Sequence, residues 1–183
     1  MEVKEEFSVK SEIFDWFEAI CFSIVAIILV FTLFVRSAQV EGESMLPNYK
    51  EGDRLILVNT AITKVEAGDV VVITQPTAVG HPLIKRVIAT EGQTIDIDYS
   101  TGEVIVDGEP IYEPYINEAI ASIPYDPIDL PLTVEKGKIF VMGDNRNASS
   151  DSRDEGIGQI DTRYILGKAI FRILPISSFG TIV

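Results

Sequence analysis

Cysteine and histidine are almost absent from this chain, which has one of each in 183 residues. Cys21 has no partner for a disulfide within the chain, and no Cys/His cluster exists that could hold a metal ion. We therefore expect no metal, and the sequence implies no organic cofactor. His81 precedes Pro82 at the entry to an apparent strand, which favours a surface turn over the role of a catalytic base.

Positive charge is also scarce. The chain has 15 Lys and Arg against 28 Asp and Glu, which gives a net charge of −13. The stretch from Val87 to Glu135 contains eleven Asp or Glu and no Lys or Arg. Such a surface repels nucleic acid and anionic lipid. We therefore expect no nucleic-acid partner, and the acidic stretch is compatible with a domain outside the cytoplasm.

One long apolar run, Ile13–Val35, stands out in this acidic sequence. As a helix it would reach about 34 Å at roughly 1.5 Å per residue, enough to cross the hydrocarbon core of a bilayer. A cleaved signal peptide would have a basic start and a shorter apolar core, and a buried helix would have a polar face. Neither alternative fits, so we expect a retained membrane span over residues 13–36.

The charges beside this span leave its orientation open, because Lys4 and Lys10 precede it and Arg36 directly follows it.

After the span, short runs rich in β-branched residues, bounded by Gly, Asp or Pro, predict strands. They cover residues 54–58, 70–73, 83–88, 94–98, 138–142 and 165–173. Asp107-Gly108 between apolar runs of residues 103–111 predicts a hairpin. Residues 110–131 hold five of the nine prolines and predict a long exposed loop. We expect a mainly β domain of antiparallel sheets or a partly open barrel.

Ser44 and Lys85 are the candidate catalytic pair. A serine hydroxyl is a poor nucleophile until a base removes its proton, and lysine can be that base only when it is neutral. Neutralising an ordinary lysine at pH 7 costs about 4.6 kcal/mol, and burial lowers this cost. Neighbours in a strand face opposite sides, so we expect only one of Lys85 and Arg86 to turn inward. From spacing alone, Lys85 at a solvated strand edge is the alternative.

Four separated blocks, in this order along the chain, together resemble the type I (bacterial) signal peptidases of the Ser-Lys class. They are residues 42–47 (GESMLP), 52–55 (GDRL), 85–88 (KRVI) and 143–153 (GDNRNASSDSR).

The resemblance implies that Ser44 is the nucleophile and Lys85 the general base. It places Ser149 where a hydroxyl orients the lysine. The residues expected to support the site as ion pairs are Asp151 with Arg153 and Asp144 with Arg86, with solvated surface bridges as the alternative. Ser150 and Ser152 are expected to be loop hydroxyls only.

Two departures from the family pattern concern the same segment. Gly42 stands where some members carry a serine that donates to the oxyanion, so the backbone N–H of Ser44 is expected to carry that role here. Asn48 stands where threonine is usual, which we expect to matter little.

The resemblance also implies a function: a membrane-bound serine endopeptidase that removes signal peptides from exported preproteins and cuts after small residues. Its partners would be those signal peptides and membrane lipid. Val40, Ile84 and Met45 are candidate walls of the substrate subsites, with core packing as the alternative.

The expected organisation is a cytoplasmic tail over residues 1–12, a single-pass anchor over 13–36 and an extracytoplasmic catalytic domain over 37–183. Two other functions stay open at this point. One is a self-cleaving Ser-Lys protease of the SOS-repressor type, which the membrane span disfavours. The other is a membrane-tethered β domain that only binds exported proteins.

Overall fold

The structure of the protein is a computed structural model that describes residues 9–74 and 80–182. Its contacts divide the chain into two units, Met1–Val35 and Arg36–Val183. The first unit contains one helix, α1 (Val9–Phe34). Residues 12–34 of it have a mean hydropathy of 2.6, so by length and composition the helix can cross a membrane.

The helix differs slightly from the predicted span of residues 13–36. It begins earlier, at Val9, and it ends at Phe34 because Val35 and Arg36 already belong to strand β1 (Val35–Gln39). Residues 1–8 of the expected tail lie outside the described residues.

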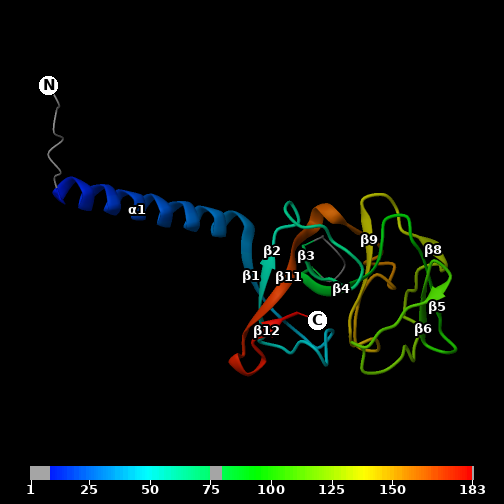
Figure 1. The fold of residues 1–183 in the computed structure, drawn as a ribbon. Coiled ribbons are helices and arrows are strands. Elements are labelled where there is room, and N and C mark those ends of the chain that lie inside the picture. The colour runs from blue at the N-terminus through cyan, green and yellow to red at the C-terminus, as the bar shows by residue number, and fades with distance from the viewer. Residues whose placement is uncertain (1–8, 75–79, 183) are drawn as a thin grey trace. The chain divides into compact units, whose positions relative to one another are not determined.

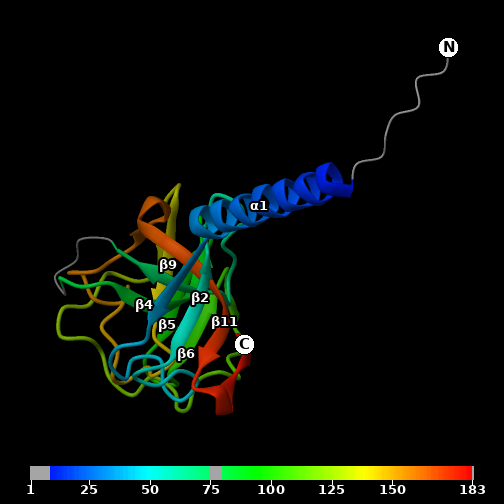
Figure 2. The ribbon, with the colours of Figure 1, turned by 90° about the vertical axis from the view of Figure 1, so that its left-hand side faces the viewer.

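The second unit is built from β-strands, as the sequence predicts (Figures 1 and 2). The larger sheet has the order β1-β2-β11-β3-β4-β9-β10, with β12 beside β11. The bounds of its other strands are β2 Arg54–Val58, β3 Val70–Ile73, β4 Leu83–Thr90, β9 Lys138–Met142, β10 Ile160–Asp161, β11 Ile165–Leu174 and β12 Gly180–Thr181. Short 3-10 turns, Thr162–Tyr164 and Ile176–Ser178, flank β11.

A smaller four-stranded sheet, of order β7-β6-β5-β8, lies beyond β9 (Figure 1). Its strands are β5 Thr94–Asp98, β6 Glu103–Val106, β7 Glu109–Pro110 and β8 Leu132–Thr133. The turn between β6 and β7 contains Asp107 and Gly108 with positive φ angles of 54° and 85°, as the predicted Asp-Gly hairpin requires. The pairings from β2 onward are antiparallel, so the predicted fold class is confirmed.

Strand β4 is an interior strand of the larger sheet. It pairs with β3 on one side and β9 on the other. Its residues also take part in all three hydrophobic clusters: Ile88 in the first, Val87 in the second, and Ile84 against the third. From Arg86 onward β4 is therefore paired with β9 and packed on both faces, whereas residues 83–85 pair with β3 alone.

The loop between β7 and β8 is not the fully exposed segment that its prolines predict. Tyr112 and Tyr125 are exposed, but Ile120 is buried in the first hydrophobic cluster and the Glu113 side chain is only 6% exposed. The prediction is wrong for these inward-facing residues because Ile120 fills an apolar space and Glu113 meets a buried arginine.

Candidate active site

Ser44 and Lys85 meet in the structure although 41 residues separate them in the sequence. Lys85 Nζ lies 2.7 Å from Ser44 Oγ, which is hydrogen-bond distance. As an ammonium the lysine donates to the hydroxyl; as a neutral amine it can accept the serine proton. The pair therefore has the geometry of a nucleophile and its base.

The turn that carries Ser44 is fixed at both ends. Before it, Val40 donates its N–H to the Asp53 carbonyl at 2.8 Å and accepts from Gly52 N–H at 3.0 Å. At the serine itself, Asn145 donates its backbone N–H to the Ser44 carbonyl at 3.0 Å, and its side chain donates to the Glu43 carbonyl at 3.1 Å. The loop 143–153 thus holds the backbone of Ser44 in place.

Lys85 lies inward, but so does Arg86, since each residue is only 2% exposed. The expectation that one of them must face water is therefore wrong. Both faces of β4 are covered at this point, one by Ser44 and the other by Asp144 and Tyr115. Two cations on opposite sides of a strand can both be buried when each has its own partners.

Burial lowers the pKa of Lys85 from its usual value of 10.5 to about 8. Asp151 and Asp144 act in the opposite direction and favour the ammonium, whereas Arg153 lowers the pKa further. At pH 7 a pKa near 8 leaves roughly a tenth of the lysine neutral, compared with a negligible fraction for an exposed one.

Both ion pairs expected from the sequence form, and both are buried. Arg86 grips Asp144 with two parallel hydrogen bonds of 2.8 Å. Arg153 Nε donates to Asp151 Oδ1 at 2.8 Å, while Asp151 Oδ2 accepts the Gly143 N–H at 3.0 Å. Their side chains are at most 3% exposed, which excludes the alternative of solvated surface bridges.

Ser149 lies against Gly143 rather than in a hydrogen bond. Its Oγ is buried and has no hydrogen-bond partner among the described residues. A Cβ on Gly143 would lie 2.3 Å from that oxygen and 2.4 Å from the Ser44 carbonyl oxygen. Gly143 is therefore the contact point between the Ser149 hydroxyl and the backbone of the nucleophile.

The other two serines of this loop differ from each other. Ser152 is fully buried and its Oγ accepts the Val141 N–H at 3.0 Å, so it ties the loop to β9 and the expectation of a loop hydroxyl only is wrong. Ser150 is exposed at the rim of a cavity that also includes Ser44.

That cavity is a cleft of about 450 Å³ with Ser44 and Lys85 in its lining. Of the three candidate subsite residues, Ile84 lines the cleft. Val40 and Met45 are 1% exposed and belong to the third hydrophobic cluster, which is the core packing that the sequence leaves as the alternative. His81 is exposed at the rim of the cleft.

Among the described residues, no group of three or more His, Cys, Asp or Glu side chains could hold a metal ion.

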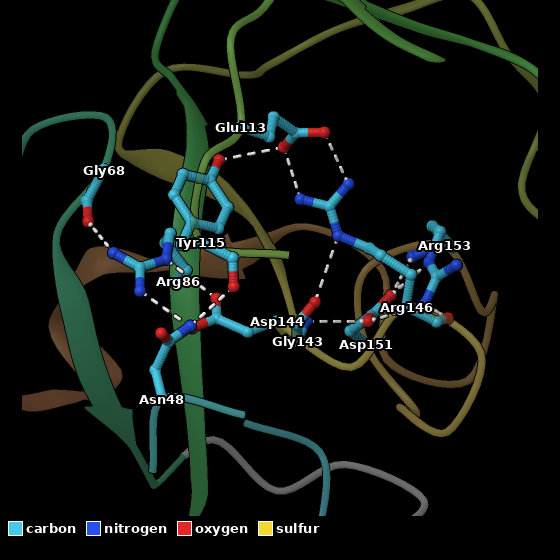
Figure 3. A network of polar contacts seen from close by, with 10 residues as sticks. All are labelled: Asn48, Gly68, Arg86, Glu113, Tyr115, Gly143, Asp144, Arg146, Asp151 and Arg153. Atoms are coloured by element: carbon cyan, nitrogen blue, oxygen red, sulfur yellow. Dashed lines mark hydrogen bonds and ion pairs between the residues drawn. The ribbon is translucent and has the colours of Figure 1, made fainter. Parts of the chain in front are cut away.

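Four further residues contact the site in ways that the sequence does not predict (Figure 3). Asn48 donates to Asp144 Oδ2 at 2.8 Å, so its replacement of the usual threonine has a structural consequence that we did not expect. Arg146, Glu113 and Tyr115 form a buried group beside Gly143. Arg146 lies within a block that carries the family resemblance; the other two lie on the irregular loop 111–131, where no periodicity marks them.

We predict that Gly143→Ala slows acylation of Ser44 by an activated ester at least about 100-fold, because the new methyl group displaces the Ser44 backbone. Intact-protein mass spectrometry measures the rate. Gly180→Ala is the control, since a Cβ there meets nothing within 4 Å. An unchanged rate in Gly143→Ala would show that the contact point does not hold the nucleophile.

We predict that Lys85→Met raises the free energy of unfolding at neutral pH by up to about 3 kcal/mol, since a tenfold change in proton affinity is worth about 1.4 kcal/mol. The folded pKa lies below the unfolded one, so the cost of the buried charge is fully present below pH 8 and disappears as pH rises past 10.5. The gain should therefore shrink between those values.

Urea unfolding followed by circular dichroism at pH 7 and at pH 10.5 measures this gain. Lys136→Met, at an exposed lysine, is the matched control and should change little. A loss of stability in Lys85→Met at pH 7 would contradict the assigned cost.

Comparison with known proteins places this chain in a family. A family model described as "Signal peptidase, peptidase S26" matches residues 13–174. The chain is 32% identical to signal peptidase I of Bacillus licheniformis over 173 residues, which covers 91% of each protein. It is 37% identical to the probable signal peptidase I-1 of Synechocystis sp. over 169 residues, covering 85% of this chain and 81% of that protein.

Similarity extends to signal peptidase IB of Staphylococcus aureus, at 34% identity over 93% of this chain and 94% of that protein. Among solved structures, a signal peptidase I from Enterococcus faecalis V583 is similar at 26% identity and a TM-score of 0.48, covering 58% of this chain and 97% of the other. On the family model and the sequence relatives, which span most of the chain, this protein belongs to the signal peptidase family of serine peptidases, peptidase S26.

Proposed function

We propose that this protein is a membrane-anchored endopeptidase that removes signal peptides from exported preproteins with a Ser44–Lys85 dyad. The observation that carries the proposal is the 2.7 Å contact between Ser44 Oγ and a buried Lys85 Nζ at the wall of a cleft. Family membership supports the reaction, because the similar proteins named above are signal peptidases.

The dyad works as an acid and a base in turn. Neutral Lys85 accepts the Ser44 proton while Oγ bonds to the scissile carbonyl carbon. The resulting ammonium gives that proton to the amide nitrogen as the C–N bond breaks, which releases the mature protein and leaves the acyl group on Ser44. Neutral Lys85 then accepts a proton from the water that bonds to the acyl carbon, and it returns this proton to Ser44 Oγ as the ester bond breaks and the signal peptide leaves.

The backbone N–H of Ser44 is the proposed donor to the oxyanion. Gly42 has no side chain with which to add a second donor, and in enzymes built around such a donor its loss costs about 10²-fold or more. The fixed turn supports the proposal, because Asn145 and Val40 hold the backbone on both sides of Ser44 and leave little reorganisation for the reaction.

The unpaired edge of β4 at the cleft supports the binding of an extended substrate. Strand β9 pairs with β4 only from Arg86 onward, so the edge of residues 83–85 on that side faces the cleft rather than another strand. A peptide can add to such an edge as a further strand. Ile84, Val72 and Leu166 give the cleft apolar walls, which suit an apolar substrate segment. Cleavage after small residues is proposed from the resemblance to type I signal peptidases.

The proposed arrangement in the cell has α1 across the membrane, the N-terminus in the cytoplasm and residues 37–183 outside. The uncharged run of residues 19–34 within a helix long and apolar enough to cross a membrane supports the anchor. Lipid then confines enzyme and preprotein to one plane, which raises their effective concentration.

The decisive experiment is cleavage of a preprotein by the full chain in detergent, beside Ser44→Ala and Lys85→Ala. We expect cutting after a small residue, located by mass spectrometry of the new N-terminus, and loss of at least about 10³-fold in both variants. Binding of the preprotein without cutting by the unaltered chain would favour the tethered binding domain instead.

The pH profile gives a second, independent prediction. Because only neutral Lys85 can act as the base, kcat/KM should rise tenfold for each pH unit below the pKa of Lys85 and level off near pH 8. Initial rates on a signal-peptide substrate between pH 5.5 and about 9.5 measure it. A profile still rising steeply at pH 9 would mean that Lys85 is not held near this pKa.

A further inference from the structure

A third buried ion pair joins the loop 143–153, through Arg146, to Glu113 on the loop 111–131. Arg146 and Glu113 form a two-pronged contact, in which Arg146 Nη1 donates to Glu113 Oε2 at 2.7 Å and Nη2 donates to Oε1. The two side chains are 0% and 6% exposed. Tyr115 also donates its hydroxyl to Glu113 Oε1 at 2.8 Å (Figure 3). Glu113 thus accepts three hydrogen bonds and has one orientation.

The third nitrogen of the Arg146 guanidinium, Nε, binds Gly143 at the start of the same loop. Its Nε donates to the Gly143 carbonyl at 3.1 Å, while the Gly143 N–H donates to Asp151 at 3.0 Å. Gly143 is therefore held on both of its peptide groups. It is also the residue against which the Ser44 carbonyl and the Ser149 hydroxyl lie, so a shift of Gly143 would be passed on to the nucleophile.

Tyr115 connects the same segment to the second arginine pair. Its ring lies under the Arg86 guanidinium, with 4.1 Å from the ring centre to Cζ. Its backbone carbonyl accepts from Asn48 Nδ2 at 2.6 Å, and that amide also donates to Asp144. Burial and the neighbouring Glu113 raise the pKa of Tyr115, so its hydroxyl stays protonated as a donor. Residues 113–115 are thus linked to Gly143 through Arg146, and to Asp144, the next residue, through Asn48 and Arg86.

We infer that Glu113 is a positioning residue for the Ser44–Lys85 pair, acting through Arg146 on Gly143. The inference rests on the proposed function and adds to it a residue from outside the loop 143–153. Glu113 aligns the guanidinium, the guanidinium fixes the Gly143 carbonyl, and Gly143 sets the serine backbone. The loop 111–131 is therefore part of the catalytic apparatus.

A purely structural ion pair is the competing account, and a double variant separates the two. Glu113→Gln and Arg146→Met each leave a buried partner unpaired, so each should lower the melting temperature, and the double variant should regain much of it. The positioning role predicts that kcat falls about 10–100-fold in all three, with KM changed less than about twofold, because none keeps an aligned donor on the Gly143 carbonyl. Recovery of kcat together with melting temperature in the double variant would overturn the inference.

Arg146→Lys keeps the test decisive if those variants fold poorly. An ammonium retains the positive charge beside Glu113, but it cannot supply both the fork to the carboxylate and the donor to Gly143. We expect a folded protein with kcat reduced at least about 10-fold, whereas wild-type kcat would refute the positioning role. Glu118→Gln, at an exposed glutamate on the same loop, is the control and should keep full activity.

The inference can fail independently of the proposed function. If the unaltered chain does not cut preproteins, the proposed function fails. The rate at which an activated ester acylates Ser44 then tests the inference alone: slower acylation in Arg146→Lys than in Glu118→Gln supports it, and equal rates contradict it.

Discussion

Everything at this site depends on keeping the amine of Lys85 out of water. The lysine lies on β4, where it pairs with Val71 of β3, and only 2% of it is exposed. This burial is the largest cause of its lowered pKa. The same burial opposes folding wherever the lysine is charged, so the site is built at a cost to stability that the surrounding core must offset.

Unpaired carboxylates around Lys85 would stabilise its ammonium form and raise its pKa again. Asp151 and Asp144 both favour the ammonium, yet each is gripped by an arginine, Arg153 and Arg86 respectively. Because each carboxylate is already paired with an arginine, it stabilises the Lys85 ammonium less than an unpaired carboxylate would. The pairs fix the loop 143–153 and at the same time limit how far its carboxylates raise the pKa of Lys85, the proposed base.

Much of the fold could be predicted from the sequence because its signals are local. The runs at 54–58, 70–73, 94–98 and 138–142 are strands with the predicted bounds, since β-branched residues and bounding turn residues act over a few positions. The two-residue strands β8, β10 and β12 could not be predicted, because so short a run carries no pattern. Strand β1 could not be predicted either, because it continues directly from the apolar helix.

The site could be predicted only in part, and for a different reason. The spacing of Ser44 and Lys85 says nothing about their contact, which the family resemblance of four blocks made an expectation. Glu113 and Tyr115 act from an irregular loop through single side chains, where neither periodicity nor a motif exists. The burial of Arg86 was missed for the same reason, because the ring that covers it comes from that loop.

The most direct test of this account is the titration of Lys85 itself in the folded protein. Lysine labelled with ¹³C at Cε can be followed by NMR from pH 6 to about 11 in detergent micelles, with Lys85→Met to assign the resonance. We predict one lysine that titrates near pH 8 and is absent from the variant. A Lys85 resonance that titrates near 10.5, with the exposed lysines, would contradict the claim that burial creates the catalytic base.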